Sequence, residues 1–116
     1  MKDDRLFLIH ILECIARIGE YTKDGKSAFM SDRLIQDAVL RNLHTLTEST
    51  QRLSEALKAQ HAEIDWQELA GFRNVLVHDY MGVDTGRVWE IVERQLPGLG
   101  RSIEAILQEL GDPRRG

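Results

Sequence analysis

Residues 64–80 read I-D-W-Q-E-L-A-G-F-R-N-V-L-V-H-D-Y, and this stretch joins a helical apolar pattern to a group of polar side chains. Its large apolar residues recur at the spacing of one helix face: Leu69, Phe72, Leu76 and Val77. Asp65 is suited to cap a helix that begins at Trp66. The stretch therefore predicts an amphipathic core helix, and on this reading alone its polar groups need have no function.

The segments before this stretch show the same spacing. Asp3 and Asp4 place negative charge where a first helix begins, and that helix is predicted to stop near residues 19–21, before turn chemistry at residues 23–27. Ser31 or Asp32 then caps a second helix that continues to Leu57. Its length of about 28 residues corresponds to roughly 42 Å, with a bend indicated by the Ser and Thr residues in its middle.

The segments after it complete the pattern. Gly82 is predicted to end the third helix, and Asp84 or Thr85 to cap a fourth. Pro97 opens a last helix, unless the final two helices form one kinked helix. The prediction is an all-α, single-domain, up-and-down bundle of roughly four to five helices. It occupies residues 1–110, and residues 111–116 are predicted to be a disordered tail.

Composition limits the possible functions. The chain has 116 residues, is 42% hydrophobic and carries a formal net charge of −4, from 15 basic and 19 acidic residues. An acidic balance counts against a nucleic-acid partner, because affinity for nucleic acid comes largely from neutralised phosphates. A local basic cluster could still bind RNA. An acidic exterior is equally suited to docking with a basic protein partner. Cys14 has no intrachain partner. No signal peptide or membrane span is indicated, so we expect a cytoplasmic protein.

Residues 73–80 concentrate the candidate chemistry. Arg73 can hold a phosphate and His78 can transfer protons near neutral pH, a pair suited to phosphodiester cleavage. On a helix they lie about 140° apart and about 7.5 Å along the axis, so either the long arginine side chain or a second subunit must bring them together. Asn74 precedes His78 by one turn, where it could fix the imidazole tautomer or contact phosphate.

Other polar residues are less specific. Arg41 and Asn42 could form a solvated or dimer-contact face, or could support the site or contact RNA. We expect no metal ligand set, because the four histidines are at least 17 residues apart: His10, His44, His61 and His78. We also expect no cofactor.

The pattern R-x-x-x-x-H-x-Y is preceded by I-x-W-x-x-x-A-G-F-R-N and followed by G-V-D-x-x-x-V-W. Together with D-A-V-L-R-N-L at residues 37–43 and L-P-G-L at residues 96–99, it resembles the HepT toxins of the HEPN superfamily. The resemblance covers most of residues 3–110.

That resemblance implies the toxin half of a type VII-like HepT/MNT toxin–antitoxin pair. It implies a metal-independent endoribonuclease with Arg73 and His78 as catalytic residues, and a homodimer in which two protomers line a shared cleft. The cognate antitoxin, a minimal nucleotidyltransferase (MNT), is implied to neutralise the toxin by AMPylation of Tyr80. The alternative is a non-catalytic helical module that binds a nucleotidyltransferase and presents its substrate.

Overall fold

The computed structural model describes residues 3–77 and 84–115, and these residues form helices without any strand. The α-helices are α1 (Asp4–Tyr21), α2 (Lys26–Ser31), α3 (Arg33–Gln51), α4 (Glu55–Gln60), α5 (Trp66–Val77), α6 (Thr85–Glu90) and α7 (Leu96–Leu110). A π-helical segment, η1 (Ile91–Gln95), joins α6 to α7, and a 3-10 turn, η2 (Pro113–Arg115), follows α7. The prediction of an all-α bundle is confirmed.

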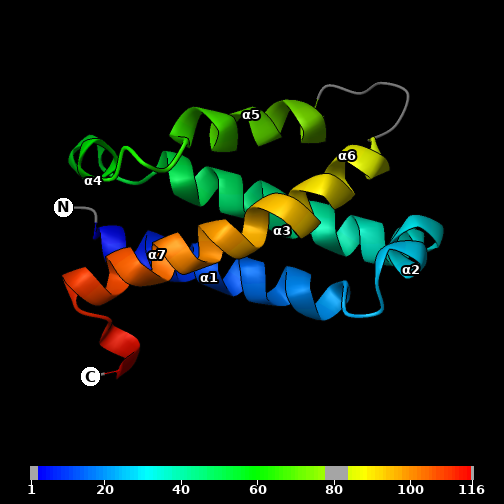
Figure 1. Cartoon of the computed structure of the whole chain (residues 1–116), viewed down its shortest axis with the longest axis horizontal. Coiled ribbons are helices and arrows are strands. Elements are labelled where there is room, and N and C mark those ends of the chain that lie inside the picture. The colour runs from blue at the N-terminus through cyan, green and yellow to red at the C-terminus, as the bar shows by residue number, and fades with distance from the viewer. Residues whose placement is uncertain (1–2, 78–83, 116) are drawn as a thin grey trace.

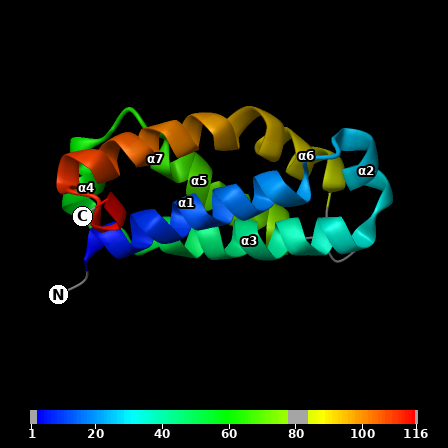
Figure 2. The same cartoon turned by 90° about the horizontal axis from the view of Figure 1, so that it is seen from below.

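The long helices run up and down along a molecule of 40 × 28 × 23 Å (Figure 1). Helix α1 packs along α3, α7 packs on the other side of α1, and α5 packs on α3. The view from below shows α1 and α3 side by side, with α7 running above α1 (Figure 2). Helix α3 therefore lies between the helix that carries residues 66–77 and the N-terminal helix.

The apolar stripes predicted from the sequence meet in the centre of this bundle. Phe29 and Phe72 are the largest fully buried side chains, and Leu8, Leu43 and Ile103 are fully inaccessible to solvent. Each such side chain contributes roughly 1.5–3 kcal/mol through removal of apolar surface from water. The packing of these side chains fixes which face of each helix remains available at the surface.

Side-chain caps set the start of most helices. Asp32 accepts a hydrogen bond from the backbone N–H of Leu34 at 2.9 Å, and Asp84 accepts one from that of Arg87 at 3.1 Å. Asp65 accepts one from Glu68 at 2.9 Å. These bonds satisfy backbone donors that have no partner within the helix.

The predicted second helix of about 28 residues is wrong in its length, since α3 ends at Gln51. Ser54 begins α4 instead, and its hydroxyl accepts a hydrogen bond from the Leu57 N–H at 3.2 Å. The carboxylate of Asp4 also accepts hydrogen bonds from the Ser54 backbone N–H at 2.8 Å and from the Ser54 hydroxyl at 2.6 Å. A contact across 50 residues of chain thus fixes the residue that caps α4.

The turn predicted at residues 23–27 is shorter than expected, because α2 already begins at Lys26. Gly25 supplies the positive φ of 92° at which the chain turns into this helix. Its apolar residue Phe29 enters the core and lies with its ring centroid 5.4 Å from that of Trp89 on α6.

The C-terminal helices form one continuous rod, which was the alternative to a separate helix opened by Pro97. In η1 the N–H of Leu96 bonds to the carbonyl of Ile91, five residues back. Pro97 has no N–H to continue an ordinary helical ladder, so this wider turn accommodates it inside the rod.

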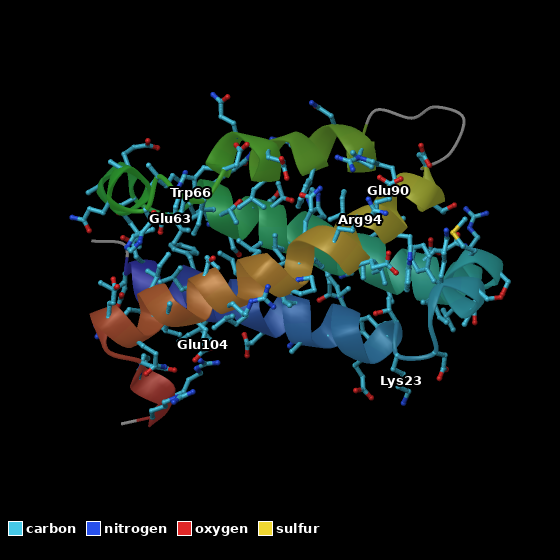
Figure 3. All side chains as sticks on the ribbon, viewed as in Figure 1. Lys23, Glu63, Trp66, Glu90, Arg94 and Glu104 are labelled. Atoms are coloured by element: carbon cyan, nitrogen blue, oxygen red, sulfur yellow. The ribbon has the colours of Figure 1, made fainter. Side chains whose placement is uncertain are left out.

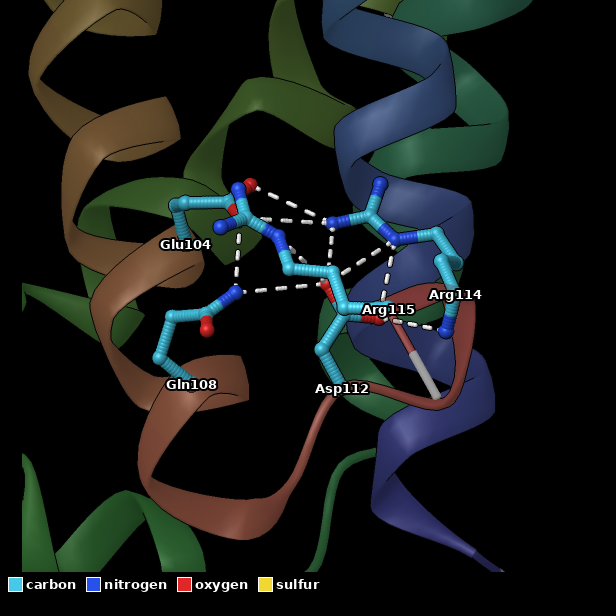
Figure 4. A network of polar contacts seen from close by, with 5 residues as sticks. All are labelled: Glu104, Gln108, Asp112, Arg114 and Arg115. Carbon is cyan, nitrogen blue, oxygen red and sulfur yellow. Dashed lines mark hydrogen bonds and ion pairs between the residues drawn. The ribbon is translucent and has the colours of Figure 1, made fainter.

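A network of polar contacts holds the segment after α7, for which the sequence predicts a disordered tail (Figure 4). The buried carboxylate of Asp112 accepts hydrogen bonds from the Arg114 backbone N–H at 2.9 Å and from its guanidinium Nη2 at 2.8 Å. The same guanidinium and that of Arg115 reach Glu104 on α7 at 3.3 and 3.4 Å. In the structure residues 111–115 are therefore packed against α7.

None of the helices in the described residues combines the length and apolar character needed to cross a bilayer.

Candidate functional site

Helix α5 presents the polar residues that the sequence singled out. Its start is fixed by the Asp65 cap and by the indole of Trp66, whose N–H donates to the carbonyls of His61 at 3.0 Å and Lys58 at 3.2 Å. Figure 3 shows Trp66 beside Glu63 at the end of the molecule where α4 lies. The helix is thereby anchored at its first turn, and its rotation is set by the buried side chains that follow.

Arg73 comes directly after fully buried Phe72, and both Arg73 and Asn74 are exposed. Because Phe72 points into the core, the residues that follow it by one and two positions point away from the core. Their side chains are thus available to a ligand at the surface of α5. His78 and Tyr80, the other predicted members of this site, lie outside the described residues.

Arg41 and Asn42 lie on α3, and the structure combines them with residues of α1. They line a surface groove of about 430 Å³ together with Arg17, Tyr21, Ala38 and Thr45. The amide Nδ2 of Asn42 donates to the Ala38 carbonyl at 2.9 Å, and the Thr45 hydroxyl donates to the Arg41 carbonyl at 3.1 Å. No residue of α5 is part of this lining among the described residues.

Sequence reasoning did not single out Arg17 and Tyr21. They are four residues apart and so share one face of α1, while the four lining residues of α3 follow the spacing of three and four along one stripe. This periodicity is visible in the sequence. The pairing of the two stripes is not, because it depends on how α1 and α3 pack.

The remaining described histidines have ordinary surface or boundary positions. His10 and His44 are exposed, and His44 lies 3.1 Å from the carboxylate of Glu48. His61 is half-buried between Glu63 and Glu109, at 3.3 and 3.8 Å. Residues 3–77 and 84–115 contain no group of three or more His, Cys, Asp or Glu side chains with metal-binding geometry.

Cys14 is buried in α1 and unpaired. Burial raises the pKa of its thiol, and the nearby charge of Arg17 acts in the opposite direction. A buried thiol with a raised pKa is a poor nucleophile, so Cys14 belongs to the core and not to a reactive site.

Residues 11–106 match the profile of a protein family described as Ribonuclease HepT-like. The chain belongs to this HepT-like family. A relative from Methanocaldococcus jannaschii, named for a gamma-glutamylcyclotransferase and an RNase, is 38% identical over 110 residues, which are 94% of this chain and 50% of that protein. The chain therefore spans half the length of this relative.

Two further HepT-like proteins match at nearly full length. A Thermococcus cleftensis protein named “Probable ribonuclease HepT” is 34% identical over 101 residues, which are 86% of this chain and 92% of that one. The solved structure of a tri-AMPylated Shewanella oneidensis HEPN toxin in complex with MNT antitoxin superimposes with a TM-score of 0.67. It is 27% identical and covers 91% of this chain and 98% of the toxin. The resemblance to HepT proteins of the HEPN superfamily is confirmed.

Proposed function

We propose that this HepT-like protein is the toxin of a toxin–antitoxin pair, and that it cleaves RNA without a metal ion. The observation that carries the proposal is the exposure of Arg73 and Asn74 on α5, within a chain whose residues 11–106 match the HepT-like ribonuclease profile. An arginine held at the surface by a buried neighbour is placed to receive a phosphate. The motif then supplies a histidine five residues later.

The proposed reaction uses the nucleophile that RNA itself carries. The 2′-hydroxyl attacks the adjacent phosphorus, its proton is removed, and the bond from phosphorus to the 5′-oxygen of the next nucleotide breaks. A 2′,3′-cyclic phosphate and a 5′-hydroxyl result, so the leaving oxygen must gain a proton. His78 transfers protons in this step, and Arg73 stabilises the negative charge that builds on the phosphate.

Asn74 is proposed to support His78. On a continued helix it lies one turn before the imidazole, where its amide can fix the tautomer or contact the phosphate. Its exposure agrees with either role. Arg41 and Asn42 lie on α3 in a groove that no described residue of α5 lines, so any contribution they make to RNA binding is separate from that of Arg73.

The proposed partner is a cognate nucleotidyltransferase of the MNT class. Its support is the solved HEPN toxin of similar fold, which carries AMP groups and is bound to MNT antitoxin. We place the modification on Tyr80, the tyrosine of the H-x-Y motif. We further propose that the protein acts as a homodimer in the cytoplasm, with the two α5 helices lining one cleft.

The deciding experiment compares wild-type protein with His78→Ala on cellular RNA in EDTA. Wild type should cleave and leave cyclic phosphate ends, whereas His78→Ala and Arg73→Ala should each lose about 100-fold or more of the rate. His10→Ala and Arg101→Ala are matched controls, because both residues are exposed and lie outside α5. Activity that requires an added metal would refute the mechanism, and full activity of His78→Ala would refute the site.

One observation favours a second candidate, a non-catalytic module that binds a nucleotidyltransferase. The net charge of −4 is unfavourable for general RNA affinity. Expression of the chain alone separates the two candidates, since only a ribonuclease should arrest growth and lose that effect with His78→Ala.

A further inference from the structure

We propose that the groove between α1 and α3 binds one nucleotide of single-stranded RNA, with Arg17 and Arg41 on phosphate and Tyr21 against a base. The groove is lined by Arg17, Tyr21, Ala38, Arg41, Asn42 and Thr45. The inference rests on the proposed ribonuclease function and adds to it a substrate-binding site away from the Arg73 motif.

The charge of the groove is opposite to that of the molecule. Its lining includes two arginines and no carboxylate among the described residues, in a chain of net charge −4. Neither Arg17 nor Arg41 forms an ion pair within residues 3–77 and 84–115, whereas Arg5, Arg87 and Arg114 do. Both arginines are exposed residues, and their donors remain for an external anion.

The other lining groups match the parts of a nucleotide. Tyr21 is 37% exposed at the end of α1, one turn beyond Arg17, and its ring offers a stacking surface. Asn42 already uses its Nδ2 on the Ala38 carbonyl at 2.9 Å, which leaves its carbonyl oxygen to accept from a base edge. Half-buried Ala38 lies on the same α3 stripe, and its small side chain leaves room in the groove.

The combination favours RNA over an acidic protein surface. Paired cations alone would suit either partner, but a cation pair next to an exposed aromatic ring is the arrangement by which proteins bind single-stranded nucleic acid. The volume of about 430 Å³ also lies within the range of about 300–1,000 Å³ typical of small-ligand sites. A groove of this size holds a single nucleotide of a longer strand.

The test uses a fluorescent 2′-O-methyl oligonucleotide, which lacks the attacking hydroxyl and is not cleaved. Its affinity for full-length protein is measured by anisotropy across a salt series. The Arg17→Gln/Arg41→Gln variant should bind the oligonucleotide more weakly at low salt, by about tenfold or more. The slope of log affinity against log salt concentration should become shallower by about 0.7 for each lost phosphate contact. Arg33→Gln/Arg101→Gln is the matched control, because both arginines are exposed and outside the groove.

Three variants that keep the charge test the remaining contacts. Ala38→Leu fills the groove, and Tyr21→Ala removes the stacking ring, so each should weaken binding at least about fivefold, whereas Tyr21→Phe should bind as wild type does. Circular dichroism verifies that each variant is folded.

A wild-type affinity and salt slope for Arg17→Gln/Arg41→Gln would overturn the groove proposal. The proposal would also be overturned if that variant lost its dimer mass while the salt dependence of its RNA affinity stayed unchanged. The groove would then be a contact between two copies of the chain. Cleavage of unmodified RNA by wild type is measured separately. Its absence would overturn the proposed function, whereas cleavage with an unchanged salt slope would overturn only the groove.

Discussion

Tyr80 follows His78 by two residues, and its phenol is the proposed acceptor of AMP. An adenylyl phosphate there would place negative charge beside Arg73 and His78, where it would pair with the arginine and repel an incoming RNA phosphate. Co-expression with the cognate nucleotidyltransferase and ATP should add adenylyl mass to the peptide that contains Tyr80. Tyr80→Phe should remain toxic in the partner's presence. Mass on another residue, or full neutralisation of an active Tyr80→Phe toxin, would indicate inhibition by occlusion.

Asp112 is a carboxyl whose titration the structure changes. Hydrogen bonds from the Arg114 side chain lower the pKa of this carboxyl from 3.8 to about 2. Since the folded-state pKa lies below the ordinary value, the stabilisation is complete above pH 3.8 and is lost as the pH falls through about 2. Asp112→Asn should therefore lower the melting temperature at pH 7, and its difference from wild type should shrink between pH 4 and pH 2. Asp24→Asn, which removes a carboxylate at an exposed position, is the matched control.

At the scale of one element, Ser54 decides where α4 begins. Ser54→Ala removes the bond to the Leu57 N–H at 3.2 Å and the 2.6 Å bond to Asp4, but keeps the backbone bond to Asp4. The expected cost is about 1–2 kcal/mol of unfolding free energy. Urea denaturation measures it, with Ser31→Ala as control, because the exposed Ser31 hydroxyl bonds only within α2 and its loss should cost less than about 0.5 kcal/mol. Equal costs for both variants would contradict the role of Ser54.

At the scale of the whole molecule, the helical offset between Arg73 and His78 bears on assembly. About 140° of separation on a continued helix means that either the long arginine side chain or a second protomer must bring the two groups together, and we predict that an arginine from one protomer acts with a histidine from its partner. Light scattering should show a dimer, and mixing inactive Arg73→Ala with inactive His78→Ala after subunit exchange should restore about a quarter of wild-type activity, from one intact site in each mixed dimer. No recovery in verified mixed dimers would place both residues of a site in one protomer.

The sequence by itself determined the all-α class, three of the helix caps and the buried face of α5. Asp32, Asp65 and Asp84 act as caps because capping bonds reach only two or three residues along the chain. The buried face of α5 followed from the spacing of residues such as Leu69 and Phe72. The exposed placement of Arg73 then follows from the position of Phe72. The proposed roles of His78 in proton transfer and of Tyr80 as the AMPylated residue stay predictions.

Only the tertiary structure decided the features that join distant segments. Asp4 bonds to Ser54 at the start of α4, and the segment after α7 is held where Arg114 meets Glu104. The groove forms because α1 and α3 pack in an orientation that places Arg17 and Arg41 at the same opening. Periodicity tells which residues share a helix face, but not which face of another helix lies beside it. That choice is made by how the buried side chains of all the helices fit together at close-packed density.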